Sequence, residues 1–146
     1  MRNQEINLFK AFGKFIEAMR LFVSSELKRK HGAAWEGKYS EYLMPNQKDS
    51  WRKSLEEDTD PIYLIDYGNL NSFAIGAKKE FFYNFFGRKS NNLPTIFNEL
   101  AEVRNILAHY LPFDKDKAEK AFLHMLEIAK NLDMDELEND IRQLKD

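Results

Sequence analysis

Three side chains suited to acid–base and phosphate chemistry lie close together in the sequence: Arg104, Asn105 and His109. They end the string Glu-Leu-Ala-Glu-Val-Arg-Asn-Ile-Leu-Ala-His, which has the apolar spacing of a helix and is soon followed by Pro112. A spacing of four residues puts Asn105 and His109 on one helix face. Arg104 lies roughly 140° around the helix from His109, but its long side chain can reach toward the same face.

These residue types suit metal-free cleavage of RNA. Histidine has an ordinary pKa of about 6.5, so His109 can accept and donate a proton near neutral pH. Arginine carries a permanent planar charge that matches phosphate oxygens, so Arg104 can stabilise charge on phosphorus oxygens. Asn105 can hold a ring nitrogen or a phosphate oxygen by hydrogen bonds. The nucleophile would be the RNA 2′-hydroxyl, which DNA lacks.

Other catalytic chemistries have no matching pattern in the sequence. The chain has no cysteine, no Gly-x-Ser-x-Gly elbow and no glycine-rich phosphate loop. Its histidines, His31, His109 and His124, form no His-Glu-x-x-His pair and no Glu-x-x-His pair of the di-iron type. We therefore expect no metal and no cofactor, which leaves the Arg-Asn-x-x-x-His stretch as the best candidate for chemistry.

Long amphipathic helices must position this stretch. Apolar residues recur at three- and four-residue steps in four segments, and no segment shows sustained alternation typical of a strand. The sequence therefore predicts an all-α fold, an antiparallel four-helix bundle with short accessory helices, as a single domain over residues 1–146. The four segments are residues 5–30, 70–85, 96–108 and 118–132, and a short helix over 134–144 follows.

Local signals predict where some helices begin. Asp60 followed by Pro61 is typical of a helix start, with the aspartate as N-cap. Gly68 is expected to interrupt the next helix, with Asn69 capping a new start. Asp114 or Asp116 is expected to cap the helix after the candidate site.

Size and charge limit the function classes. The chain has 146 residues, 43% of them hydrophobic, and a formal net charge of −2, which argues against bulk-charge tracking of long nucleic acids but allows a small phosphate site. No apolar run approaches the ~20 residues needed to cross a bilayer. The first residues lack the apolar core of a signal peptide, so we expect a cytoplasmic protein without membrane association.

The Arg104-Asn105 pair followed by His109 resembles the motif of the HEPN superfamily, the higher eukaryotes and prokaryotes nucleotide-binding domains. That motif is an arginine, usually a polar residue next to it, and a histidine a few residues later, at the end of a long helix. A helix start like Asp60-Pro61 is also familiar in the branch found beside RNA-processing and defence modules. The resemblance covers most of the chain in architecture and about eleven residues in a specific motif.

The resemblance implies a metal-independent endoribonuclease that works as a homodimer, with arginines and histidines of both copies meeting in one composite site. It implies catalytic roles for Arg104 and His109, and a supporting or RNA-binding role for Asn105. It also implies a toxin–antitoxin or phage-defence setting, with an antitoxin or a second effector protein as a possible partner. A dimer makes physical sense, since one histidine cannot be general acid and general base at once.

Other interpretations remain open from the sequence. Related domains that have lost activity bind RNA or proteins, and a helical scaffold could carry the motif by accident. Arg104 could be a surface residue and His109 a helix cap, while Tyr110 could reach phosphate or simply pack. We expect His31 and His124 to be structural or without a role. The basic groups at 28–30, 78–79 and 88–89 and the rings at 81–86 could contact RNA, but solvated helix faces and core packing fit their spacing better.

Overall fold

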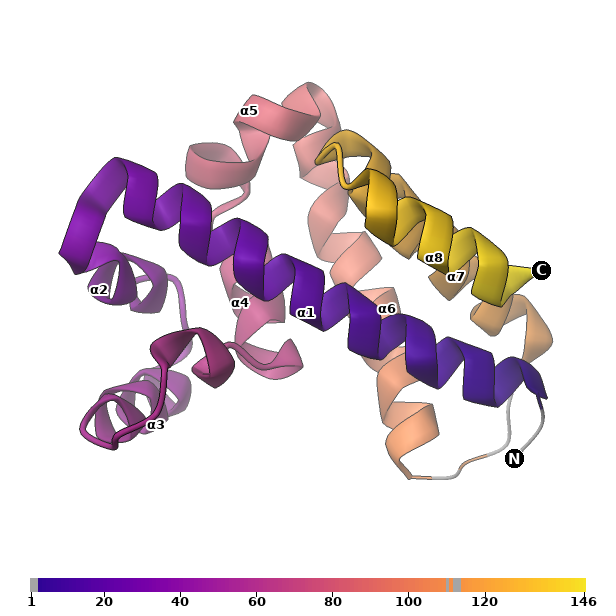
Figure 1. Cartoon of the computed structure of the whole chain (residues 1–146), viewed down its shortest axis with the longest axis horizontal. Coiled ribbons are helices and arrows are strands. Elements are labelled where there is room, and N and C mark those ends of the chain that lie inside the picture. The colour runs from indigo at the N-terminus through magenta and orange to yellow at the C-terminus, as the bar shows by residue number, and fades with distance from the viewer. Residues whose placement is uncertain (1–2, 110, 112–113) are drawn as a thin grey trace.

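The computed structural model describes residues 3–109, 111 and 114–146, and in this part of the chain every regular element is helical (Figure 1). The all-α prediction is confirmed. The longest helix, α1 (Asn3–His31), matches the segment predicted over 5–30, and its last turn carries Lys28, Arg29, Lys30 and His31. Positive charge at a helix C-terminus complements the helix dipole.

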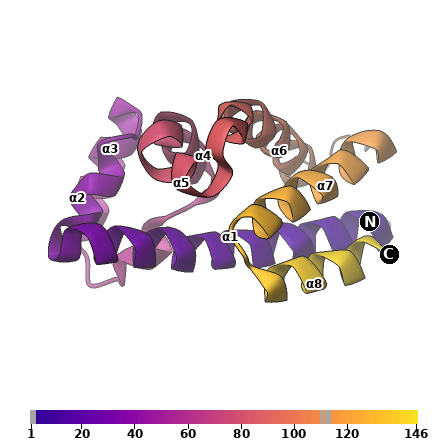
Figure 2. The same ribbon diagram turned by 90° about the horizontal axis from the view of Figure 1, so that it is seen from above.

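One layer of the fold is built from α1 and the two C-terminal helices. Helix α7 (Lys115–Asn131) begins after the N-cap Asp114, and α8 (Asp135–Lys145) follows it closely. Figures 1 and 2 show α8 lying along α1, with the start of α1 and the end of α8 at the same end of the molecule. The face that α1 turns inward carries buried apolar side chains at three- and four-residue steps. They are Leu8, Ala11, Phe12, Phe15, Met19, Val23 and Leu27.

The other layer contains α4 (Tyr67–Gly76) and α6 (Leu93–Ala108), which pack against each other. In Figure 1, α6 crosses behind α1 at a steep angle. The short helices α2 (Trp35–Ser40) and α3 (Pro45–Leu55) cover one end of α1 and α4. This arrangement does not confirm the finer prediction of a four-helix antiparallel bundle. None of the described helices is both long enough and apolar enough to span a membrane.

The predicted cap at Asn69 is wrong. Helix α4 begins three residues earlier than that cap predicts, and Asp66 is its N-cap, accepting a hydrogen bond from the Asn69 backbone N–H at 2.8 Å. The Asn69 side chain reaches back to the Asp66 N–H at 3.1 Å, which completes a capping box. The Asp60 cap is confirmed, but the element after it is a 3-10 helix, η2 (Pro61–Leu64). Because Asp60 and Asp66 each cap the start of a helical element, only the short η2 turn fits between them.

The segment predicted as one helix over 70–85 is interrupted. After α4 the chain makes a π-helical turn, η3 (Lys78–Phe82), then α5 (Tyr83–Phe86) and a 3-10 segment, η4 (Gly87–Asn92). The Phe82 N–H reaches back five residues to the Ala77 carbonyl, at 3.2 Å. This extra residue in the turn lets the neighbouring rings of Phe81 and Phe82 both be buried, which a regular helix does not favour for adjacent positions.

Candidate functional site

Helix α6 presents the candidate residues on its exposed face. Its other face is buried against the core through Ile96, Phe97, Leu100, Val103 and Leu107, together with Leu93 at its start. Because this stripe fixes the rotation of the helix, Arg104, Asn105 and His109 all project from the exposed side of its last turns. The sequence interpretation of a helix ending at His109 matches the observed end of α6 at Ala108.

His109 is the C-cap residue of α6. Its backbone N–H donates to the Asn105 carbonyl at 3.1 Å, and the next turn closes through the Leu111 N–H, which donates to the Ile106 carbonyl at 3.1 Å. The His109 residue is exposed. Its backbone is therefore held by the helix end while its ring stays accessible. Tyr110, which was considered as a supporting residue, lies outside the described residues.

The Arg104 guanidinium lies over the ring of Tyr67, with 5.6 Å between its carbon and the ring centroid. Tyr67 is buried in the first turn of α4, and its hydroxyl has no hydrogen-bond partner among the described residues. Burial raises the pKa of this hydroxyl well above its ordinary value, and the charge of Arg104 only partly opposes that rise. Through this contact with the Tyr67 ring, the Arg104 side chain lies against the first turn of α4. No hydrogen bond joins the side chains of Arg104, Asn105 and His109 in the described part of the structure.

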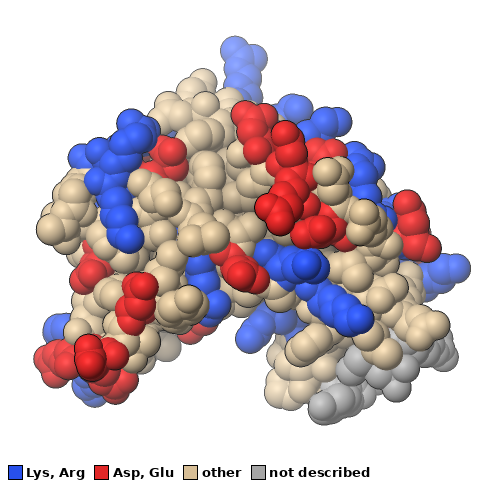
Figure 3. Space-filling model, viewed as in Figure 1, with Lys and Arg blue, Asp and Glu red and all other residues tan. Residues whose placement is uncertain are grey.

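A groove of about 280 Å³ opens beside Arg104. It lies between α1, the start of α4 and the end of α6, and Figure 3 shows this face of the molecule hollowed, with Lys and Arg side chains along the hollow. Its walls are mainly apolar, and two arginines and one aspartate border it. The lining residues are Phe9, Phe12, Gly13, Ile16, Arg20, Asp66, Tyr67, Arg104, Leu107 and Ala108.

Two groove residues of α1 lie where residue type alone would not put them. Phe9 is apolar, yet it is 62% exposed at the groove. Arg20 is charged, yet its Nε donates to the Ile65 carbonyl at 2.6 Å and its side chain is partly buried. Helical spacing defines faces within one helix, and no local signal identifies which residues of α1, η2 and α4 will meet beside α6.

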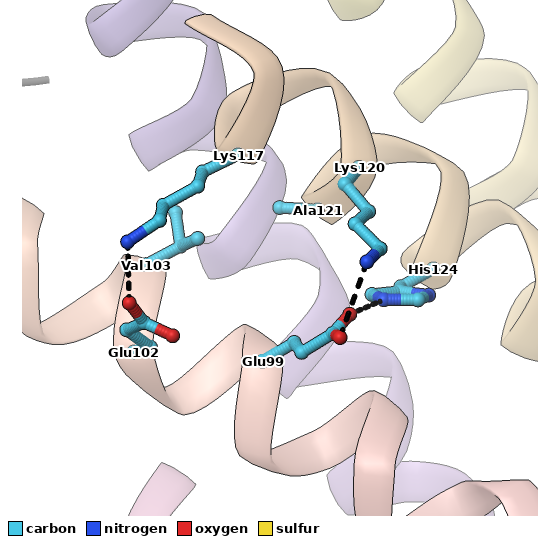
Figure 4. Close-up of a pocket in the computed structure, with 7 residues that line it drawn as sticks. All are labelled: Glu99, Glu102, Val103, Lys117, Lys120, Ala121 and His124. Carbon is cyan, nitrogen blue, oxygen red and sulfur yellow. Dashed lines mark hydrogen bonds and ion pairs between the residues drawn. The ribbon is translucent and has the colours of Figure 1, made fainter. Parts of the chain in front are cut away.

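A second charged cluster joins α6 to α7 (Figure 4). Glu99 accepts hydrogen bonds from His124 at 2.5 Å and from Lys120 at 3.2 Å, and Glu102 accepts one from Lys117 at 2.5 Å. The hydrogen bond from His124 lowers the pKa of Glu99 below its ordinary value, with help from Lys120 and against the smaller effect of burial. The His124 side chain is 15% exposed. It links two helices, as expected for a structural histidine.

Several of the other basic and aromatic groups named in the sequence analysis take part in packing. The ammonium groups of Lys28 and Lys30 lie over the rings of Trp35 and Phe81, at 5.4 and 5.7 Å from the ring centroids. The rings of Phe81, Phe82 and Phe86 are buried in the core. Across residues 3–109, 111 and 114–146, no group of three or more histidine or acidic side chains is arranged to hold a metal ion.

A family model described as Swt1-like HEPN matches residues 10–133 of the chain. The match runs from within α1 to the residues just after α7 and leaves out α8. No curated protein and no solved structure matches the chain. The matched region contains both the exposed end of α6 and the groove residues from Phe12 onward.

Proposed function

Because this chain belongs to the Swt1-like HEPN family, we propose that it is a metal-independent endoribonuclease whose site is completed by a second copy of the chain. The observation that carries the proposal is the joint exposure of Arg104, Asn105 and His109 on one end of α6, beside a groove with a second arginine. Among the described residues, none of these three side chains is engaged in an ion pair. They are therefore free to contact a phosphodiester.

In the proposed reaction His109 of one copy takes the proton from a 2′-hydroxyl. The freed oxygen attacks the adjacent phosphorus, a new O2′–P bond forms, and the P–O5′ bond breaks. Charge builds on the non-bridging oxygens, where the Arg104 guanidinium stabilises it. The leaving 5′-oxygen takes a proton from His109 of the partner subunit, so that the products are a 2′,3′-cyclic phosphate and a 5′-hydroxyl. Asn105 would hold a phosphate oxygen or orient the substrate.

Exposed apolar side chains near the motif support pairing of two copies. Phe9 is 62% exposed at the groove that Arg104 and Ala108 also border, and Leu111, just after the motif, is 50% exposed. Covering apolar surface of this kind favours association. Pairing through this surface would bring two copies of the α6 end together and supply the second histidine.

Cleavage in the presence of EDTA tests the proposal. Wild type and the variants His109→Ala and His31→Ala are incubated with labelled single-stranded RNAs of varied sequence. His31 is an exposed histidine at the end of α1, which makes it a matched control. We expect wild type and His31→Ala to cleave and His109→Ala to lose about 10²–10⁴-fold in rate.

The same assay separates the enzyme from its main alternative. If purified wild-type dimer leaves all RNAs intact but binds them, and His109→Ala binds equally well, the chain is an inactive RNA-binding domain. A toxin–antitoxin or phage-defence setting belongs to the proposal through the family resemblance. It predicts that expression of wild type arrests cell growth while His109→Ala does not, and growth unaffected by wild type would contradict that setting.

A further inference from the structure

Two arginines near the motif are each paired with an aromatic ring. Arg104 lies over Tyr67, and Arg20 lies over Tyr63, with 5.9 Å between the guanidinium carbon and the ring centroid. The two pairs come from four different elements, α6, α4, α1 and η2, and both arginines border the same groove. Two cations facing one groove repel each other unless an anion lies between them.

Neither arginine has a carboxylate partner in the described part of the chain, where the ion pairs involve other residues. The one acid at the groove, Asp66, already accepts the Asn69 N–H as the cap of α4. Arg20 uses its Nε to hold the Ile65 carbonyl, which leaves the two terminal nitrogens of the guanidinium for a ligand. The groove therefore offers fixed positive charge with unused donors.

Tyr63 extends this surface away from the motif. It is 65% exposed, although a ring of this size could be buried, and it stands in η2 between the groove and a second hollow of about 430 Å³. That hollow has a polar wall from α3, including Gln47, Ser50 and Ser54. The indole nitrogen of Trp51, which is also at this hollow, is buried without an acceptor among the described residues.

Figure 3 shows that the molecule is concave on the side that lies between α3 and the end of α6, the elements labelled in Figure 1. Phosphate groups match unpaired guanidiniums, and unstacked bases match exposed rings and apolar walls, so a single strand of nucleic acid fits both features of this surface. An acidic peptide would use the cations but not the exposed ring.

We propose that this surface, from Arg104 through Arg20 to Tyr63, is the substrate-positioning track of the protein. It binds the single-stranded RNA next to the cleaved bond, with Arg104 and Arg20 contacting phosphates and the Tyr63 ring stacking on one base, an assignment that rests on the nuclease function proposed above. Tyr63 and Arg20 are positioning residues, and neither takes part in proton transfer.

Binding of uncleavable RNA tests the track separately from catalysis. The full chain is titrated into a fluorescein-labelled single-stranded RNA whose riboses are all 2′-O-methylated, and anisotropy gives the dissociation constant. We expect Tyr63→Ala to weaken binding about tenfold, within the range known for loss of one base–aromatic stack. Tyr63→Phe keeps the ring and should restore binding. Tyr83→Ala is the matched control, since Tyr83 is an exposed tyrosine on α5, outside the track.

The salt dependence of the same binding tests Arg20. Loss of one phosphate contact to a single strand reduces the slope of log K against log salt by about 0.7, so Arg20→Gln should show this reduction. Arg20→Lys keeps the charge and should retain most of the slope, which separates the phosphate contact from the Ile65 hydrogen bond. Arg88→Gln, at an exposed arginine of η4, should leave the slope unchanged.

Two outcomes overturn the track. One is that wild type cleaves RNA while Tyr63→Ala and Arg20→Gln match wild type in binding and KM, in which case the nuclease function stands without the track. The other is that Tyr63→Ala changes the oligomeric state in analytical ultracentrifugation and not RNA affinity, which makes the surface a protein interface. Binding that depends on Tyr63 and Arg20 in a protein that cleaves no RNA supports the track and contradicts only the nuclease function.

Discussion

Helix α6 carries two charged regions that differ in how their charges are compensated. Near its middle, Glu99 and Glu102 are paired with Lys117, Lys120 and His124 of α7. At its end, Arg104, Asn105 and His109 are exposed, and the Arg104 guanidinium lies over the ring of Tyr67 without an ion pair to any described residue. Each region contains a histidine and at least one charged side chain. Their residue types alone would make either region a candidate for acid–base chemistry.

Pairing of charges within the chain distinguishes the structural region of this helix from the region that is available to a ligand. In the middle region the chain supplies the partner of each charge, so the free energy of those contacts stabilises the packing of α6 on α7. At the end region, no described residue forms an ion pair with Arg104 or His109, so their charge and hydrogen-bonding groups are available to a ligand. Four substitutions test this distinction, with effects expected on cleavage for the end region and on stability for the middle region.

The largest effect is expected from removal of the Arg104 charge. Arg104→Ala should lower kcat for RNA cleavage about 10²–10³-fold, as loss of an oxyanion-stabilising donor does in other enzymes. Arg104→Lys should recover only part of this, because a lysine cannot make the planar two-donor contact. The matched control in the middle region is Lys117→Ala, which should cleave at the wild-type rate. Equal losses for Arg104→Ala and Lys117→Ala would remove the distinction between the regions.

A smaller effect is expected from a charge placed on the exposed apolar surface. Phe9→Asp should weaken the proposed dimer about tenfold or more, because burial of a phenylalanine contributes about 1.5–3 kcal/mol, and cleavage should fall with the loss of dimer. Leu123→Asp changes a half-exposed residue of α7 and serves as control. Sedimentation velocity measures the dimer. Unchanged sedimentation of Phe9→Asp would place the interface elsewhere.

In the middle region, His124→Ala should affect stability and leave cleavage intact. Loss of the hydrogen bond to Glu99 is expected to lower the free energy of unfolding by about 1 kcal/mol, which corresponds to a fall in Tm of about 2–4 °C for a chain of this size. Thermal melting followed by circular dichroism measures the change. A loss of kcat without a change in Tm would assign His124 to the chemistry.

The smallest effect is expected in how the free energy of unfolding changes as the pH is lowered. Because the pKa of Glu99 is lower in the folded protein than its ordinary value, its contribution is fully present above that ordinary value and is lost as the pH falls through the lowered one. Glu99→Gln should therefore unfold more easily than wild type at neutral pH, with the difference shrinking at low pH. Urea titrations at a series of pH values would show it. A constant difference at all pH values would contradict the role of this carboxylate.

Local sequence signals predicted most helices and caps correctly. The apolar spacing of α1, α6 and α7, the caps at Asp60 and Asp114 and the basic end of α1 depend on contacts within a few residues, so they can be read from neighbours in the chain. The cap of α4 was misplaced because Asn69 is both a good cap and a good capping-box partner, and its reach back to Asp66 decides between the roles.

The sequence by itself determined that α6 ends near His109, that Asn105 and His109 share one face and that an apolar stripe forms another. Only the tertiary structure decided that Glu99 meets His124, that Phe9 stays exposed, that Arg20 borders the same groove as Arg104 and that Arg20 lies over Tyr63. Spacing within one helix sets which residues share a face, but contacts between α1, η2, α4 and α6 depend on how whole helices cross. That crossing is set by the shapes of their packed side chains, which no short stretch of sequence contains.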